Sequence, residues 1–259
     1  MKTAFITGAS SGIGLALARE LAKRGYRVAL SARRAELLEA EAAAIVKSGG
    51  EAMAVACDVA DAAAVKSAIA AVETRWGAID LAVANAGIGP PTPALRLKLS
   101  DVNATMQINY HGMVHLFAAV IPGMAERKAG RFAGVASLAG LRGLPSSASY
   151  SASKAAMQAF MEAMRVELAP LGVGVTIINP GFVRTPMTDL NKFDMPFMVE
   201  ASQAARIVAD GLERGKREID FPFPTATAMR FARLLPNALY DRVMRKAAAQ
   251  SMDAAGGKP

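Results

Sequence analysis

Tyr150 and Lys154 are the side chains of this sequence best placed to carry out acid–base chemistry together. They stand four positions apart in the run Y-S-A-S-K, a spacing that places two side chains on one face of a helix, one turn apart. A free tyrosine has a pKa of about 10, which makes it a poor proton donor or acceptor near neutral pH. A neighbouring ammonium lowers that pKa, so the pair is a candidate general acid/base unit. The alternative is an ordinary helix face on which a tyrosine lies beside a solvated lysine.

A glycine-rich turn near the N-terminus is a candidate phosphate site. Gly8, Gly12 and Gly14 follow the spacing G-x-x-x-G-x-G, between a strand expected over residues 3–7 and a helix expected over residues 15–24. Glycines permit a tight turn and the close approach of backbone N–H groups, and the N-terminus of the helix stabilises a pyrophosphate. The alternative is a turn that only separates two elements. The position of the glycines directly after the first strand disfavours this alternative. The other residues of the turn expected to contact the same ligand are Ser10, Ser11 and Ile13.

Two arginines, Arg33 and Arg34, follow the second expected strand. Folds that bind NAD usually carry an acid at this place for the ribose 2′-hydroxyl, whereas the forked donors of a guanidinium suit a 2′-phosphate. The pair therefore favours NADP(H) as the cofactor, with NAD(H) as the alternative. An arginine at the N-terminus of a helix opposes the helix dipole, which disfavours the other explanation, an exposed helix start.

Polar residues follow the later expected strands as well. Asp58, with Val59 after it, follows the third strand and is a candidate acceptor for an adenine amino group; a helix or turn cap is the alternative. An N-A-G run begins at Asn85 after the fourth strand, and Ser137 follows the fifth, 13 positions before Tyr150. Ligands of open α/β sheets bind at the C-terminal ends of the strands, so these residues are expected to gather at one site.

These residues need a framework in which strands and helices alternate, and the sequence supplies it. Elements recur at intervals of roughly 25 residues, a pattern typical of βαβ units and a parallel sheet. Strands are expected over residues 3–7, 26–31, 52–57, 79–84, 131–136, 173–178 and 219–221. Helices are expected over residues 15–24, 35–47, 62–75 with Asp61 near its start, 100–127 with Ser100 as its N-cap, the segment from Tyr150 to about 171, and 200–214.

In this order along the chain, the motifs resemble those of the short-chain dehydrogenase/reductase superfamily over residues 3–220. The first three elements of the resemblance are the T-G-x-x-x-G-x-G cofactor motif that begins at Thr7, the adenine-contacting acid at Asp58, and the N-A-G element Asn85-Ala86-Gly87. The catalytic tetrad of the family is matched by Asn109, Ser137, Tyr150 and Lys154. The segment that holds the nicotinamide is matched by Asn179, Pro180, Gly181, Val183 and Thr185.

The resemblance implies a fold and an activity. The fold is a single Rossmann-type, doubly wound α/β domain with a seven-stranded parallel sheet and helices on both faces. The activity is the NADP(H)-dependent interconversion of a carbonyl (ketone or aldehyde) and an alcohol. Arg33 resembles the basic residue of NADP-preferring members. Position 10 is Ser, where many of those members place a basic residue, so the choice of cofactor rests on Arg33 and Arg34.

The resemblance also implies a role for each member of the tetrad. Tyr150 protonates the carbonyl oxygen as hydride arrives from the nicotinamide, while Lys154 lowers the pKa of Tyr150 and holds the nicotinamide ribose hydroxyls. Ser137 hydrogen-bonds the carbonyl oxygen and stabilises its developing negative charge. Asn109 supports a water that connects Lys154 to solvent; the alternative for Asn109 is a polar residue at a helix irregularity.

The segment after the nicotinamide loop, where the family has a mobile lid, is apolar. Methionine and phenylalanine there indicate an adaptable pocket and a hydrophobic or lipid-like carbonyl substrate, whereas ordinary helix packing is the alternative. The residues concerned are Met187, Phe193, Met195, Phe197 and Met198.

Composition narrows the class of protein. The 259 residues suit one large α/β domain or two small ones, and 53% hydrophobic residues supply a core. The single cysteine, Cys57, excludes an intrachain disulfide and suits a reducing compartment, so a cytoplasmic protein is expected. His111 and His115 stand four apart without an evident acidic or cysteine partner, so no metal site is predicted.

The sequence is also expected to be soluble and unprocessed. It has no uncharged run of transmembrane length. The uncharged residues 3–18 superficially resemble a signal peptide, but their glycine motif makes strand, turn and helix the better interpretation.

Residues 225–259 form an expected amphipathic helical extension to a catalytic domain of residues 1–224. Net charge is +8, and the six basic and two acidic residues of positions 226–259 carry +4 of it. Pro236 is the expected kink or break. The apolar face is expected to pack on the chain itself, to pair with a subunit of a homo-oligomer (dimer or tetramer), or to lie on an anionic membrane; nucleic acid ranks last because no motif for it is present. The residues of that face recur every four positions: Phe231, Leu235, Leu239 and Val243.

Other functional classes share parts of this pattern. An NAD-dependent alcohol dehydrogenase of the same fold is one alternative. A noncatalytic cofactor-binding regulator is another, against which the complete tetrad argues. A sugar-nucleotide epimerase or dehydratase shares the Y-x-x-x-K spacing, but such enzymes usually have a larger C-terminal substrate domain than 259 residues accommodate.

Overall fold

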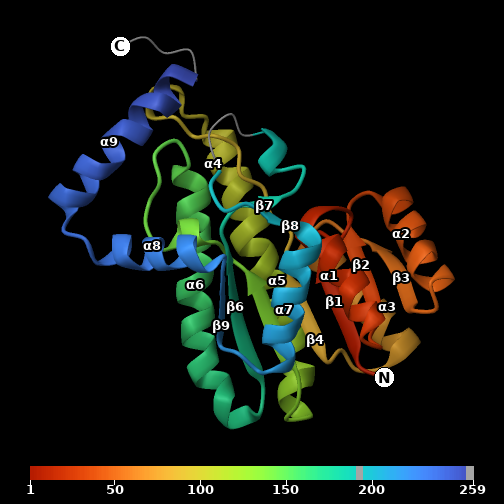
Figure 1. Ribbon diagram of the computed structural model, residues 1–259. Helices are drawn as coiled ribbons and strands as arrows, with labels where there is room; N and C mark the ends of the chain where they lie inside the picture. The colour runs from red at the N-terminus through yellow and green to blue at the C-terminus, as the bar shows by residue number, and fades with distance from the viewer. Residues whose placement is uncertain (191–194, 255–259) are drawn as a thin grey trace.

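The computed structural model describes residues 1–190 and 195–254. At its centre is a seven-stranded sheet (Figure 1). The strands of this sheet are β1 (Thr3–Thr7), β2 (Arg27–Ala32), β3 (Glu51–Ala56), β4 (Leu81–Ala84), β5 (Arg131–Val135), β6 (Gly174–Pro180) and β9 (Glu218–Phe221). Their order is β3-β2-β1-β4-β5-β6-β9, and every neighbouring pair is parallel. The predicted seven-stranded parallel sheet is confirmed.

Helices cover both faces of the sheet, as expected for a doubly wound domain. The first seven are α1 (Gly12–Lys23), α2 (Ala35–Lys47), α3 (Ala62–Trp76), α4 (Leu99–Thr105), α5 (Gly112–Glu126), α6 (Ala148–Leu168) and α7 (Ala201–Glu213). Buried side chains of α1, α2 and α7 pack on one face, and those of α3, α5 and α6 pack on the other. In β1, Ala4 and Ile6 face the first layer and Phe5 the second, because successive side chains of a strand point to opposite faces.

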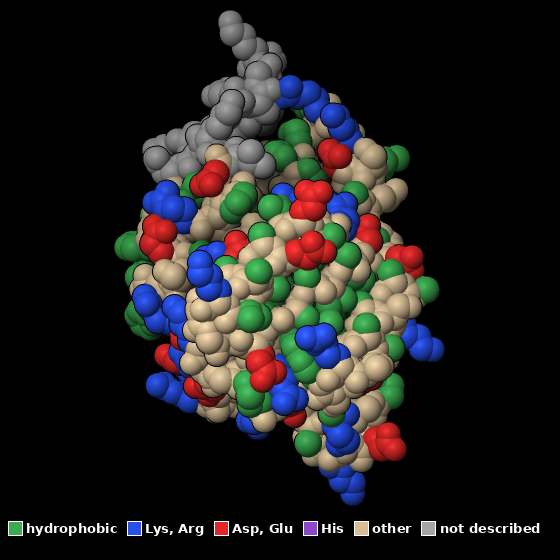
Figure 2. Space-filling model, turned by 90° about the vertical axis from the view of Figure 1, so that its right-hand side faces the viewer, with side chains coloured by type: hydrophobic (Ala, Val, Ile, Leu, Met, Phe, Trp, Pro, Cys, Tyr) green, Lys and Arg blue, Asp and Glu red, His purple; other side chains and the backbone are tan. Residues whose placement is uncertain are grey.

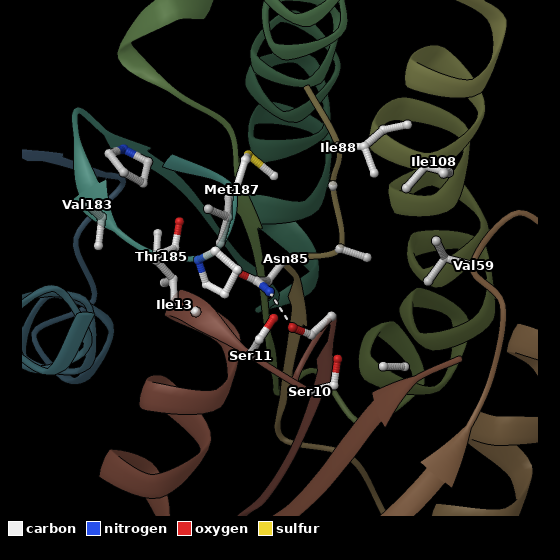
Figure 3. A pocket seen from close by; sticks show the side chains of 18 of the residues that line it. Ser10, Ser11, Ile13, Val59, Asn85, Ile88, Ile108, Val183, Thr185 and Met187 are labelled. Atoms are coloured by element: carbon white, nitrogen blue, oxygen red, sulfur yellow. Dashed lines mark hydrogen bonds between the residues drawn. The ribbon is translucent and has the colours of Figure 1, made fainter. Parts of the chain in front are cut away.

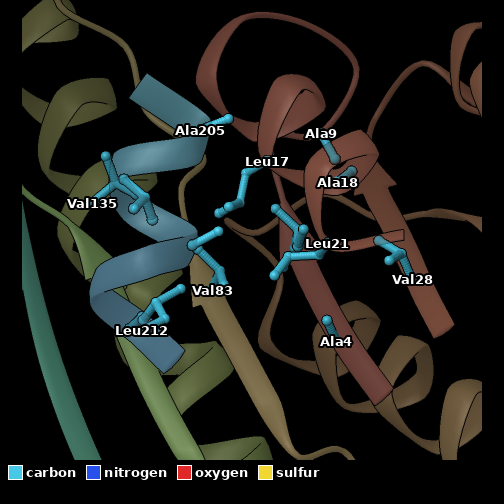
Figure 4. Close-up of a cluster of buried hydrophobic side chains, with 14 of the residues drawn as sticks. Ala4, Ala9, Leu17, Ala18, Leu21, Val28, Val83, Val135, Ala205 and Leu212 are labelled. Atoms are coloured by element: carbon cyan, nitrogen blue, oxygen red, sulfur yellow. The ribbon is translucent and has the colours of Figure 1, made fainter. Parts of the chain in front are cut away.

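The contact between α1 and α7 fixes the helix that begins at the glycine turn. Leu17 and Leu21 of α1 are completely buried and pack with Val83 of β4 and with Ala205 and Leu212 of α7 (Figure 4). The two leucines are one helical turn apart and therefore share a face. Each fully buried leucine contributes roughly 1.5–3 kcal/mol to stability, so this packing holds the N-terminus of α1 firmly beside the sheet.

The strand order reverses between β1 and β4. From β1 the chain proceeds to β2 and β3 on one side, whereas from β4 it proceeds to β5, β6 and β9 on the other. The loops that leave these two strands diverge to opposite faces of the sheet, which opens a crevice at their carboxyl ends. The glycine turn after β1 and the run that begins at Asn85 after β4 lie at this crevice.

The prediction of a single helix over residues 100–127 is wrong about where the helix starts and about its being uninterrupted. α4 begins at Leu99, with Lys98 rather than Ser100 at the N-cap position. A π-helical turn, η2 (Met106–His111), then separates α4 from α5. A π turn inserts a wider loop of backbone into a helix, and here Asn109 is completely buried. The apolar periodicity of the sequence continues across the π turn, so this periodicity did not indicate where the helix is interrupted.

Other element boundaries differ by a few residues from those expected. α1 starts at Gly12 rather than at position 15, because the last glycines of the turn form its first helical turn. β6 extends to Pro180 and thereby carries Asn179 at the carboxyl edge of the sheet. Asp61 caps α3 as expected, since its Oδ1 accepts hydrogen bonds from the backbone N–H groups of Ala63 and Ala64.

The C-terminal extension is a pair of helices, α8 (Phe223–Leu234) and α9 (Asn237–Ala254), and Pro236 lies at the break between them as predicted. Arg142 anchors the extension to the segment of residues 141–147. Its Nη1 donates to the carbonyl oxygens of Arg233 and Leu235, each at 3.1 Å, and its Nη2 donates to Asn237 Oδ1 at 2.8 Å. Tyr240 donates its hydroxyl to the carbonyl oxygen of Gly143, and the Arg142 guanidinium lies 4.3 Å from the Tyr240 ring centroid.

Most of the apolar face of the extension does not pack on the described part of the chain. Phe231, Leu239 and Val243 are 67%, 47% and 60% exposed. Self-packing of these side chains is therefore not found within residues 1–190 and 195–254, and pairing with another subunit or contact with a membrane stay predictions. None of the described helices has the length and apolarity needed to cross a membrane.

Charges on one face of the molecule are of mixed sign (Figure 2). On the face seen in Figure 2, lysine and arginine side chains lie interspersed with acidic ones rather than gathered in one patch. Arg24 illustrates the pairing, because its guanidinium binds Glu20, Asp210 and Glu213 at 2.8 Å each and so joins α1 to α7. Exposed pairs of this kind contribute little individually, roughly 0–1 kcal/mol.

Candidate active site

A cavity of about 320 Å³ opens at the carboxyl ends of β1, β4, β5 and β6. It is lined by the residues predicted to contact the cofactor except Gly14, which is buried beneath the turn, and Asn179, which is buried in β6. In Figure 3, Val183, Thr185 and Met187 lie on one side of this cavity and Ile88, Ile108 and Val59 on the other. Lining residues that the sequence did not point to are Ala32, Cys57, Ile88, Ile108, Val135, Ala136, Pro186 and Thr188.

The glycine turn forms a cradle of bare backbone. Gly8 and Gly12 have φ of +65° and +58°, a region that favours glycine. A Cβ on Gly14 would lie 2.3 Å from Asn85 Nδ2 and 2.6 Å from the carbonyl oxygen of Gly8. Ser11 occupies the N-cap of α1 without a side-chain capping bond. Exposed N–H groups at a helix N-terminus, with no side chain in the way, are the donors that a dinucleotide pyrophosphate requires.

Asn85 connects the glycine turn to β4. Its Nδ2 donates to the carbonyl oxygens of Thr7 and Gly8 at 2.9 and 3.2 Å. The hydroxyl of Thr7 in turn accepts from the backbone N–H groups of Asn85 and Ala86 at 3.0 and 3.1 Å. The N-A-G run therefore fixes the shape of the phosphate turn as well as lining the cavity.

Arg33 and Arg34 lie exposed at the end of β2, beside the same cavity. Arg34 donates from Nη2 to Ser10 Oγ at 3.0 Å, which joins the basic pair to the glycine turn. Arg33 makes no hydrogen bond or ion pair with the described residues. Asp58 also lines the cavity, but its Oδ1 accepts from the backbone N–H of Ala60 at 3.0 Å, so the turn cap foreseen as an alternative is present.

Tyr150 and Lys154 share one face of α6 and both reach the cavity, as their spacing predicted. Lys154 Nζ lies 5.6 Å from the Tyr150 ring centroid and donates to the carbonyl oxygen of Val135 at 2.7 Å. Ser137 stands at the end of β5, and its side chain hydrogen-bonds Tyr150. Ser137 Oγ also accepts from the backbone N–H of Ala139 at 3.1 Å. The structure thus brings these three side chains together.

Asn109 lies next to this group but is already fully bonded. Its Oδ1 accepts from the backbone N–H of Ile88 at 2.8 Å, and its Nδ2 donates to Ile88 O and Ser153 Oγ, each at 2.9 Å. A Cβ on Gly87 would be 3.2 Å from Asn109 Oδ1 and 3.5 Å from Lys154 Nζ, so the two side chains converge there. Asn109 ties the segment after β4 to α6, and its support of a water remains a prediction.

Burial dominates the electrostatics of the pair. It lowers the pKa of Lys154, which is only 3% exposed, to about 7. Burial also raises the pKa of Tyr150, and the hydrogen bond with Ser137 only partly opposes this. Burial therefore decides the direction of the Tyr150 pKa shift in the protein alone, and a lowering of that pKa by Lys154 stays a prediction. A lysine with a pKa near 7 is largely neutral just above that pH, so it provides little positive charge to stabilise a phenolate.

The expected apolar lid is only partly described. Met187 lines the cavity and is 41% exposed, whereas Phe197 is 61% exposed near the short strand β8 (Val199–Glu200), which pairs with β7 (Val183–Arg184). Met195 and Met198 are partly buried beside them. Phe193 lies outside the described residues.

The two histidines lie close together on neighbouring helical turns. His115 Nδ1 hydrogen-bonds the carbonyl oxygen of Val59 at 2.8 Å, and the rings of His111 and His115 are 6.5 Å apart between centroids. Within residues 1–190 and 195–254, no group of three or more His, Cys, Asp or Glu side chains is arranged to hold a metal ion.

One functional candidate was missed by sequence reasoning. Gln158 Nε2 donates to the carbonyl oxygen of Ser137 at 2.9 Å. The signal was its position four residues after Lys154, which continues the face of α6 that carries Tyr150.

Comparisons with known proteins agree with this geometry. A model described as short chain dehydrogenase matches residues 2–194. An uncharacterized oxidoreductase of Myxococcus xanthus (strain DK1622) is 44% identical over 245 residues, or 95% of this chain and 97% of the relative. A 3-oxoacyl-(acyl-carrier-protein) reductase of Synechocystis sp. is 40% identical over 189 residues, 73% of this chain and 76% of that protein.

A solved structure of similar fold is an actinorhodin polyketide ketoreductase variant with NADPH. It is 30% identical, with a TM-score of 0.80 over 87% of this chain and 97% of its own. The residues that the family model matches include the glycine cradle, the N-A-G run and the Ser–Tyr–Lys group. The chain belongs to the short-chain dehydrogenase family and is an oxidoreductase of that kind.

Proposed function

We propose that this protein is an NADP(H)-dependent carbonyl reductase that acts on hydrophobic ketones or aldehydes. The observation that carries the proposal is that Tyr150 and Lys154 line one cavity with the glycine cradle, while Ser137 hydrogen-bonds Tyr150 from beside it. The cavity is framed by backbone N–H groups at one end and by a proton-donating hydroxyl at the other, which is the arrangement that a reduction by a dinucleotide needs.

The residues of this chain then divide the reaction among them. Bound in the cavity, the nicotinamide would supply the hydride to the substrate carbon. Tyr150 gives its phenolic proton to the carbonyl oxygen, and the hydroxyl of Ser137 donates a hydrogen bond to the same oxygen while negative charge develops there. Lys154 faces the same cavity and is placed to bind ribose hydroxyls. Asn109 holds the segment at Ile88 in place against α6.

The class of substrate is inferred from the cavity and from relatives. Met187 and the apolar side chains of Ile88 and Ile108 line the cavity, and such flexible apolar surfaces adapt to hydrophobic ligands. The similarity to a 3-oxoacyl-(acyl-carrier-protein) reductase and to a polyketide ketoreductase supports a ketone over a sugar nucleotide.

Oxidation of NADPH in the presence of a carbonyl panel tests the proposed activity. The panel contains acyl ketones, steroid ketones and small aldehydes, each with NADPH and with NADH. We expect turnover of at least one hydrophobic ketone, faster with NADPH. Binding of NADPH without turnover of any carbonyl would instead identify a noncatalytic cofactor-binding protein.

Arg33 is expected to set the preference for NADPH over NADH. The Arg33→Ala variant should bind NADPH more weakly by about 1.5–3 kcal/mol, the range for a hydrogen bond to a charged group, and should bind NADH almost unchanged. Fluorescence titration with both cofactors measures the ratio. Equal ratios in wild type and Arg33→Ala would show that Arg33 does not bind the 2′-phosphate, and Arg34→Ala is the next variant to compare.

A further inference from the structure

A chain of hydrogen bonds runs from the backbone of Ser137 to the surface of α8. Gln158 Nε2 donates to Ser137 O at 2.9 Å and to Asn179 Oδ1 at 2.8 Å. Asn179 Nδ2 donates to Asp220 Oδ1 at 2.9 Å, and Arg230 Nε donates to Asp220 Oδ2 at 2.7 Å. The chain therefore crosses from α6 through β6 and β9 to α8, the first helix of the C-terminal extension.

Two groups that only accept hydrogen bonds, the carboxylate of Asp220 and the carbonyl oxygen of Ser137, set the direction of the bonds between them. Because an ionised carboxylate only accepts, Asn179 turns its amide N–H towards Asp220. The oxygen of Asn179 then faces Gln158, whose amide N–H donates both to it and to the carbonyl oxygen of Ser137. The charge of Asp220 thus holds the Asn179 amide, and the Gln158 amide through it, in the orientation that Ser137 requires.

Arg230 is the cation that keeps this charge in place. The side chain of Asp220 is only 11% exposed, and a nearly buried carboxylate needs an opposite charge close by. Arg230 supplies it from a side chain that is 56% exposed, and its Nη2 also donates to Glu218 Oε2 at 2.7 Å. Its hydrogen bond to Asp220 raises the pKa of Arg230.

At the other end, the chain fixes the peptide group of Ser137. The carbonyl oxygen of Ser137 accepts from the backbone N–H of Gly140 at 3.0 Å as well as from Gln158 at 2.9 Å. A Cβ on Gly140 would lie 3.0 Å from Gln158 Cδ, so a glycine lets the amide lie close under this turn. Two donors on one oxygen restrain the backbone from which the Ser137 hydroxyl projects.

We propose that Arg230, Asp220, Asn179 and Gln158 form a positioning relay through which the C-terminal extension holds Ser137 in its working orientation. The inference rests on the proposed function, in which the Ser137 hydroxyl binds the substrate carbonyl oxygen. None of the four residues lines the cavity, so they are positioning residues. They act through the backbone of Ser137.

Two variants interrupt the relay at opposite ends, and a third controls for the loss of an exposed ion pair. Arg230→Met removes the cation, and Gln158→Leu removes the amide next to Ser137. Arg19→Met is the matched control, because Arg19 is 52% exposed and binds one carboxylate, that of Glu41, far from the site. Misplacement of a reacting group costs up to roughly 100-fold in rate, so kcat for the ketone should fall about 10- to 100-fold in the two relay variants. Arg19→Met should keep the kcat of wild type, and NADPH affinity should be unchanged in all three.

Rescue by charge separates positioning from simple destabilisation. Arg230→Lys keeps the positive charge beside Asp220 and should recover most of kcat, while its melting temperature need not recover. Loss of kcat in Arg230→Lys equal to that in Arg230→Met would contradict a relay that works through the charge of Asp220.

Hydrogen exchange provides a measurement that does not depend on activity. The amides of Ala139 and Gly140 bond to Oγ and O of Ser137, so both should exchange faster in Arg230→Met and Gln158→Leu than in wild type or Arg19→Met. Unchanged exchange together with unchanged kcat overturns the relay. If exchange changes as expected but wild type reduces no ketone, the relay stands and the proposed function fails. If Ser137→Ala lowers kcat and the relay variants do not, the function stands and the relay fails.

Discussion

The Tyr150→Phe variant is expected to lose almost all carbonyl reduction while it binds NADPH nearly as well as wild type. Phenylalanine keeps the ring against Gly89, where a Cβ would already lie 3.0 Å from Tyr150 Cδ2, and removes only the hydroxyl. A positioned acid contributes roughly 10²–10⁴-fold to a rate, so the loss should fall in that range. Steady-state rates with a reactive ketone and fluorescence titration with NADPH measure the two quantities.

Tyr110→Phe is the matched control for this loss of a phenolic hydroxyl. Tyr110 packs edge-on against Phe160 with centroids 6.1 Å apart and is not a lining residue of the cavity, so its variant should keep the wild-type rate. A Tyr150→Phe variant that retains more than about a tenth of the wild-type rate would be incompatible with the role of Tyr150 as acid.

Lys154 should make the protein more stable as the pH rises from 6.5 to 8.5 in the absence of added cofactor. Burial lowers the pKa of Lys154 to about 7, whereas an unfolded lysine has a pKa near 10.4. Between these values the unfolded chain binds more protons than the folded chain, so the free energy of unfolding increases with pH. The increase should approach about 1.4 kcal/mol per pH unit above pH 7. Urea unfolding at each pH measures it.

Comparison with Lys154→Met isolates this effect from other titrating groups. Burial raises the pKa of Tyr150 and of Cys57 above their usual values, so these groups lower stability only at higher pH and are common to both proteins. The variant should be more stable than wild type at pH 6.5, and the difference should shrink towards pH 8.5. Parallel pH profiles for the two proteins would mean that the pKa of Lys154 is not lowered in the folded protein.

The fold and most of the site followed from local patterns in the sequence. Alternating apolar runs and glycine turns predicted the parallel sheet, and the four-residue spacing predicted that Tyr150 and Lys154 share a face of α6. Local spacing was sufficient because each of these features depends on a few neighbouring residues. The cavity contains the predicted residues of the loops for the same reason, since these follow the carboxyl ends of strands.

Features that depend on distant residues or on burial were not predictable in this way. The π turn at Asn109 is coupled to its hydrogen bonds with Ile88, 21 positions earlier. The role of Asp220 needs Asn179, 41 positions away, and no spacing rule connects the two. The raised pKa of Tyr150 was not predictable either, because a sequence shows that a lysine is near but not that both side chains are buried.

The anchoring of residues 141–147 by the extension has a consequence for the order of events during synthesis. Arg142 and its partners in the extension are separated by 91 to 95 residues along the chain. Every strand of the sheet, through Phe221, leaves the ribosome before the helices that hold this segment. Contacts between residues so far apart form late in folding, because the intervening chain must first lose conformational entropy. A nascent chain therefore has its complete sheet and all of its proposed catalytic residues before the segment beside them is held in place, so we expect catalytic competence only after α8 and α9 have left the ribosome.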